Sequence, residues 1–220
     1  MKIKSILFNN EMVRAILDGR KDATRRIVKG FIPDDAVWGY TAFTPKGYIS
    51  CRGTFADGYG EKFFKLPCEP GDILYVRETW CKYGDLNDYD QIIEGTEKYY
   101  YLADGANPTP YNCFLVQRNG YDEYKDTPVW HPSIHMPKEA ARIWFKVTNV
   151  RVERLQEISG EDLIKEGIDL FQSSYVRVAF DEFKNIWNST IKKSDLAQYG
   201  WDANPYIWVI EFEKCEKPKE

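Results

Sequence analysis

Apolar and polar residues alternate most clearly along residues 141–155, and this pattern predicts the longest strand of the chain. The alternation changes phase near Asn149, which predicts a bulge or a bend at that point. Residues 205–213 predict a final strand with apolar residues on both faces, as is typical of a central strand. Shorter strands are expected at residues 3–8, 24–28, 38–43, 48–51, 73–78, 99–103 and 113–116.

Three stretches carry a helical pattern. Polar residues that can cap their first turns are Asn9 or Asn10, Ser159 with Asp162, and Ser173 or Ser174. The expected last residues are Gly19, Gly167 and Asn188. The order of strand, helix, several strands, two helices and strand predicts an α+β fold with a mainly antiparallel, partly closed sheet flanked by helices.

Residues 81–137 are the least regular part of the chain and contain few aliphatic residues. We interpret them as an insertion in a single domain of residues 1–220, with a frayed tail at residues 214–220. His131 and His135 have a spacing that suits a metal only on a helix, and Pro132 and Pro137 disfavour a helix there. A rigid extended loop is therefore expected, with neither a metal nor a cofactor.

Composition narrows the class of protein. The net charge of −4 argues against a general coat of nucleic acid, although it permits a local basic pocket. The five cysteines are odd in number and irregularly spaced, which disfavours a disulfide framework. We find no signal peptide and no apolar run of membrane length, so a cytoplasmic protein with no membrane partner is expected.

Residues 19–26, Gly-Arg-Lys-Asp-Ala-Thr-Arg-Arg, contain the densest candidate chemistry. Lys21 precedes Thr24 by three residues, so its amine can turn toward the hydroxyl. Such a cluster can hold an anion, orient a polar substrate or activate an oxygen nucleophile, and it can also be a solvated basic turn. Glu78 ends a predicted strand on its core-facing side, where it needs a cation such as Arg77 or the basic cluster.

Several of these features occur together in a known family. They are Gly-Arg-Lys-x-x-Thr-x-Arg after a short helix, Pro-Gly-Asp before a strand, Glu-Gly at the end of a helix, and the terminal strand at residues 206–212. This ordered set resembles the ASCH domain family of the PUA-like superfamily. The phage and prophage members are most similar, because they carry Val-Arg-Glu-Thr-Trp, here residues 76–80, and a Pro-rich insertion like residues 134–137.

The resemblance implies a small barrel whose cleft accepts nucleic acid or a modified nucleoside, in a phage or prophage protein of the bacterial cytoplasm. Small bacterial members are amidohydrolases that remove the acetyl group of N(4)-acetylcytidine with a Lys, a Thr and a Glu. The resemblance places these at Lys21, Thr24 and Glu166. Thr24 could attack if Lys21 were neutral, or Glu166 could orient a water molecule. This chain is about twice as long as those members, and its insertion could reshape the cleft.

Substrate contacts are expected from the residues around this triad, namely Arg25, Arg26, Glu78 and Trp80. The alternative function is a non-catalytic module that binds single-stranded RNA or DNA. In that case the basic cluster would contact phosphates, and Trp38, Trp80 or Trp130 would stack on a base. A phage factor that acts through a protein partner is a third possibility, and no residue identifies that partner.

Overall fold

The computed structural model describes residues 1–85, 87, 93–105, 113–118, 121–125, 129–168 and 176–218. The chain divides into two compact units, each built from segments that are distant in the sequence. The first unit contains residues 1–2, 19–73 and 145–214, and the second contains residues 3–18, 74–144 and 215–220. The predicted insertion at residues 81–137 therefore lies in the second unit, together with the N-terminal strand and helix.

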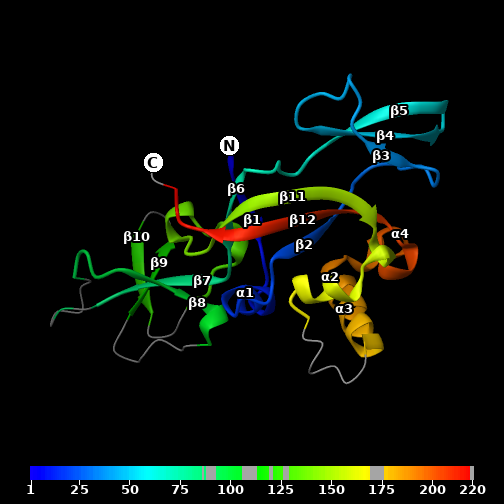
Figure 1. Cartoon of the computed structure of the whole chain (residues 1–220). Coiled ribbons are helices and arrows are strands. Elements are labelled where there is room, and N and C mark those ends of the chain that lie inside the picture. The colour runs from blue at the N-terminus through cyan, green and yellow to red at the C-terminus, as the bar shows by residue number, and fades with distance from the viewer. Residues whose placement is uncertain are drawn as a thin grey trace. The chain divides into compact units, whose positions relative to one another are not determined.

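The main sheet of the first unit places β11 (Trp144–Arg154), β12 (Tyr206–Cys215) and β2 (Ala23–Ile27) side by side (Figure 1). β12 pairs antiparallel with β2 and is buried along most of its length, as its two apolar faces predicted. β2 lies at the edge of the sheet. The end of α2 (Gly160–Lys165) meets the start of this edge, where the Asp22 amide donates to the Lys165 carbonyl at 3.0 Å.

The helices of this unit cover β12. Leu163 of α2 and Phe183 and Trp187 of α3 (Val176–Thr190) pack into one buried cluster with Ile207 and Val209 of β12. α2 begins with the expected capping box, in which the Ser159 and Asp162 side chains bond to each other's backbone amides. The short α4 (Leu196–Tyr199) and single 3₁₀ turns at Leu155–Glu157, Lys193–Asp195 and Trp201–Ala203 complete the unit.

Three further strands of the first unit form an antiparallel sheet in the order β3 (Val37–Gly39), β4 (Tyr48–Phe55) and β5 (Gly58–Lys65) (Figure 1). β5 was not predicted, because its side chains are mostly exposed on both faces and so show no apolar alternation. At Gly53 of β4 an added Cβ would lie 2.6 Å from Pro33, so the preceding loop packs directly on the backbone there.

The second unit combines β1 (Ile3–Leu7), α1 (Asn10–Leu17) and β6 (Ile73–Arg77), with β1 next to β6. The Asn9 side chain accepts from the Met12 amide at 2.8 Å and caps α1, as predicted. A four-stranded antiparallel sheet has the order β10 (Tyr121–Lys125), β9 (Cys113–Arg118), β7 (Trp80–Gly84), β8 (Lys98–Tyr101). Single 3₁₀ turns occur at Leu102–Asp104, Ser133–His135 and Lys138–Ala140.

The α+β class is confirmed, whereas closure into a barrel is not found, because these sheets remain open. A barrel requires the two outer strands of a sheet to pair, and the edge of β2 meets the end of a helix instead. The expected caps at Ser173 or Ser174 lie outside the described residues. In the part of the chain that is described, no helix is long and apolar enough to cross a membrane.

Candidate active site

Lys21 and Glu166, which are 145 residues apart in sequence, meet in the first unit. Lys21 precedes β2, and Glu166 is the C-terminal cap of α2. The Lys21 Nζ atom lies 2.5 Å from Oε2 of Glu166 and 3.0 Å from its carbonyl oxygen. Both side chains are almost completely buried, with exposed fractions of 0% and 6%. The structure thus brings together two of the three residues that the resemblance named as catalytic.

Arg25 holds the other oxygen of the same carboxylate. Its Nη1 donates to Oε1 of Glu166 at 3.0 Å, and its Nη2 donates to Glu153 at 3.0 Å and lies 3.5 Å from Asp162. The Arg25 side chain is 1% exposed, and its Nε finds no hydrogen-bond acceptor among the described residues. Arg25 therefore fixes the Glu166 carboxylate, and its guanidinium is enclosed by protein carboxylates rather than open to a ligand.

A ring of further charges surrounds this cluster. Arg151 of β11 contacts Glu153, Asp162 and Glu211 at 2.8–3.4 Å, and Lys165 contacts Glu211 at 3.3 Å. The sequence analysis missed these residues, although Arg151 and Glu153 are charged residues at the end of the longest predicted strand. Asp162 was predicted only as a helix cap, and it both caps α2 and pairs with Arg151.

Burial lowers the pKa of the Lys21 amine below its ordinary value of 10.5. The charge and hydrogen bond of Glu166 oppose this shift, while the positive charges of Arg26 and Arg25 add to it. The Asp162 carboxyl shows the reverse balance. Burial would raise its pKa, but hydrogen bonds from Ser159 and the charges of Arg25 and Arg151 lower it overall. Burial therefore makes the Lys21 amine easier to deprotonate than an exposed lysine, although it lies in an ion pair with Glu166.

Thr24 and Arg26 occupy the alternate positions of β2, opposite Ile210 and Trp208 of β12. Because side chains alternate along an extended segment, these two point to the face opposite Arg25. Thr24 is almost completely buried, with an exposed fraction of 1%. Burial lowers the pKa of the Arg26 guanidinium, and the charge of Glu166 opposes this shift.

Glu78 belongs to the second unit and has a different partner from the two that were predicted. It is completely buried, and Nε and Nη2 of Arg142 donate to its two oxygens, each at 2.9 Å. Arg142 also pairs with Asp104 at 2.8 Å. The prediction that Arg77 or the basic cluster neutralises Glu78 was wrong, because the backbone carbonyls of Met136 and Ile134 accept from Arg77. Burial raises the pKa of the Glu78 carboxyl, and Arg142 opposes the rise.

The tryptophans proposed for base stacking are already packed. The Trp38 ring packs against the rings of Phe64, Tyr206 and Trp208, with 5.1–6.3 Å between ring centroids. Trp80 lies 4.8 Å from the His131 ring, and its backbone pairs with that of His131. Trp130 packs against Cys81 and Tyr83, two buried residues of β7.

Over the described ranges of the chain, His, Cys, Asp and Glu side chains form no group of three or more that could hold a metal ion. His131 precedes the 3₁₀ turn at Ser133–His135 and His135 is its last residue, so the two do not share a helix face. No protein-family model, curated protein or solved structure matches this chain.

Proposed function

We propose that this chain is an ASCH-type amidohydrolase that removes an acyl group from the exocyclic amine of a modified nucleoside. The contact between the buried Lys21 amine and the Glu166 carboxylate carries the proposal. The resemblance names these two residues, and no local sequence pattern would otherwise bring them together. Hydrolysis of an amide needs a group that takes a proton from the nucleophile and returns it to the leaving amine.

Lys21 and Glu166 can share this proton transfer. In this mechanism the unprotonated form of the Lys21 amine accepts a proton from an attacking water, and burial makes this form easier to reach than in an exposed lysine. Water then adds to the acyl carbon, the C–N bond breaks, and the proton passes to the departing base amine. Glu166 is the more exposed of the pair, so it is the member that solvent reaches first.

An attacking water suits this arrangement better than an attacking Thr24. A nucleophilic hydroxyl is normally within hydrogen-bond reach of its base, and the Lys21 amine is directed at the carboxylate and carbonyl oxygens of Glu166. Thr24 and Arg26 instead share the other face of β2, opposite Ile210 and Trp208 of β12. Arg25 orients Glu166 and does not bind substrate, because carboxylates already enclose its guanidinium.

Turnover of N(4)-acetylcytidine by the purified chain tests the proposal. We expect Glu166→Gln and Lys21→Met each to lower kcat/KM by about a hundredfold or more, as is usual for the loss of a proton-transfer group. Far-UV circular dichroism shows whether each variant is folded. Lys165→Gln is the matched control, because Lys165 is the last residue of the same helix but contacts Glu211 instead. Full activity in both site variants, or no turnover of any N(4)-acylated cytidine by the natural chain, would refute the proposal.

A further inference from the structure

The β3–β4–β5 sheet turns one face to solvent, and this face carries large aromatic side chains. Residues that lie directly opposite each other in an antiparallel sheet share a face, so Tyr59 and Phe63 of β5 lie on the same face as Tyr48 and Arg52 of β4. Tyr59 is 74% exposed and Phe63 is 38% exposed. On the other face the β4 residues Cys51 and Phe55 are buried.

Positive charges lie between these rings. Arg52 and Lys65 are exposed on the same face, and Lys46 is exposed in the turn before β4. Among the described residues, none of the three has an ion pair or a side-chain hydrogen bond. The one acidic side chain on this face of β5, Glu61, is bonded to the Ser50 hydroxyl of β4.

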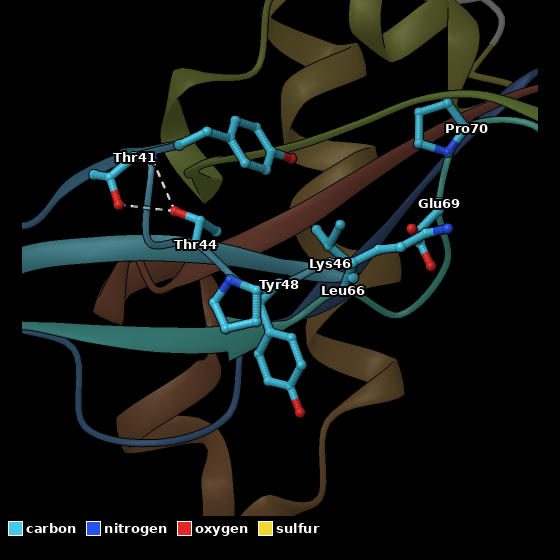
Figure 2. A pocket seen from close by; sticks show the side chains of 10 residues that line it. Thr41, Thr44, Lys46, Tyr48, Leu66, Glu69 and Pro70 are labelled. Atoms are coloured by element: carbon cyan, nitrogen blue, oxygen red, sulfur yellow. Dashed lines mark hydrogen bonds between the residues drawn. The ribbon is translucent and has the colours of Figure 1, made fainter.

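A hollow of about 310 Å³ continues the face beyond the start of β4. Tyr40, Lys46 and Tyr48 contribute to its lining, and Glu69, which also lines it, is paired with Lys2 at 3.2 Å (Figure 2). Its volume is at the lower end of the range for small-molecule sites. From Tyr59 to the strand position opposite Tyr48 the face extends for about 20 Å, at roughly 3.3 Å per residue.

We propose that this sheet face binds a short stretch of single-stranded nucleic acid. Bases stack on Tyr59, Phe63 and Tyr48, and phosphates meet Arg52, Lys65 and Lys46. Sites for single-stranded nucleic acid combine such exposed rings with unpaired cations, because every base has a flat face that can stack and every phosphodiester carries a negative charge. The hollow takes a terminal base or nucleoside. This surface is separate from the Lys21–Glu166 cluster, and the inference does not depend on hydrolysis.

A second copy of the chain is the competing occupant. Pairing through the free edge of β5 is disfavoured, because two glycines and two lysines interrupt its eight residues, and such residues blunt strand edges. The unpaired cations also favour an anionic partner over an identical face that carries the same charges.

The test is fluorescence anisotropy of a labelled twelve-nucleotide single strand of mixed sequence, as RNA and as DNA, with the full chain at several salt concentrations. We expect Tyr59→Ala with Phe63→Ala to weaken binding about tenfold at fixed salt. Tyr59→Phe keeps the ring and should bind like the natural chain. Arg52→Gln with Lys65→Gln should lower the slope of log K against log salt by about 1.4, at about 0.7 per phosphate contact.

Lys192→Gln is the charge control, because Lys192 is exposed and unpaired on a distant part of the sequence. All of these variants should hydrolyse a small acylated nucleoside as the natural chain does, which separates this inference from the proposed function. The inference is overturned if the natural chain binds neither oligonucleotide at low salt, or if the double alanine variant binds unchanged. It is equally overturned if light scattering shows that Tyr59→Ala with Phe63→Ala converts a dimer into monomers while oligonucleotide binding is unchanged.

Discussion

The carboxylates of Glu166 and Glu78 are both buried, and each is neutralised by cations in its own unit. Glu166 meets two cations, Lys21 and Arg25, whereas Glu78 receives a two-pronged contact from Arg142 alone. A buried ion pair adds little stability over an apolar pair, but loss of one partner leaves a buried charge that costs several kcal/mol. The two carboxylates therefore respond differently to the loss of one partner.

Replacement of Arg142 by Met should destabilise the fold by about 3 kcal/mol at neutral pH, because Glu78 then loses its neutralising cation. Urea unfolding measures the effect, and the exposed Arg177→Met should change the free energy of unfolding by less than about 0.5 kcal/mol.

The deficit of this variant should shrink as pH falls. Burial already raises the pKa of Glu78 above 4.5, and loss of Arg142 raises it further. The folded state then holds more protons than the unfolded state above pH 4.5, so acidification through the folded pKa favours folding. A deficit that stays constant between pH 8 and pH 5 would contradict the assignment.

Lys21 should give the opposite pH dependence. Its folded pKa lies below 10.5, so between these two values the unfolded state holds more protons and stability rises with pH. Lys21→Met should lack this rise when urea unfolding is compared with the natural chain. In the proposed reaction the rate should increase as Lys21 loses its proton, and Lys21→Arg should abolish turnover because arginine stays charged.

At the scale of single elements, the loop before β3 packs on β4 only because residue 53 is glycine. Cβ atoms at this position would approach Pro33 to 2.6 Å and Asp35 to 2.9 Å. Asp35 in turn accepts from the amide and hydroxyl of Thr54, so the loop is anchored on both sides of the glycine.

Gly53→Ala should therefore destabilise the fold by about 1–3 kcal/mol through overpacking. Gly60→Ala is a matched control, since Gly60 lies directly opposite Gly53 on β5 and an added Cβ there meets nothing within 4 Å. Thermal unfolding of the two variants compares them. Equal effects would mean that the loss arises from the strand backbone and not from the contact with Pro33.

Caps and alternation made several elements predictable from sequence. Asn9 and the pair Ser159 and Asp162 marked the starts of α1 and α2, because their bonds are local. β5 could not be predicted in this way, since neither of its faces is covered enough to need an apolar row. The partner of Glu78 was also missed, because Arg142 is 64 residues away and nothing local specifies it.

At the scale of the whole molecule, the net charge of −4 limits how nucleic acid can bind. Only a local group of cations can act, so the natural chain should show a salt slope near −2, as expected for three phosphate contacts at about 0.7 each. The oligonucleotide titration described above measures it. A much steeper slope would indicate a larger basic surface than the sheet face.

The overall architecture was predicted less fully than its parts. The α+β class followed from the order of elements, whereas the division into two units did not, because each unit draws on distant segments. Barrel closure was expected from the resemblance and failed where the end of α2 occupies the edge at Asp22. The Lys21–Glu166 contact was anticipated from the resemblance, and its catalytic role remains a prediction.

The separation of Lys21 and Glu166 has a consequence for synthesis on the ribosome. Glu166 is made 145 residues after Lys21, which takes roughly 7–30 s at bacterial and eukaryotic elongation rates. During that time the Lys21 amine lacks its carboxylate partner, and the start of β2 lacks its contact with Glu166. The nascent chain thus cannot form the Lys21–Glu166 contact before residue 166 has been translated.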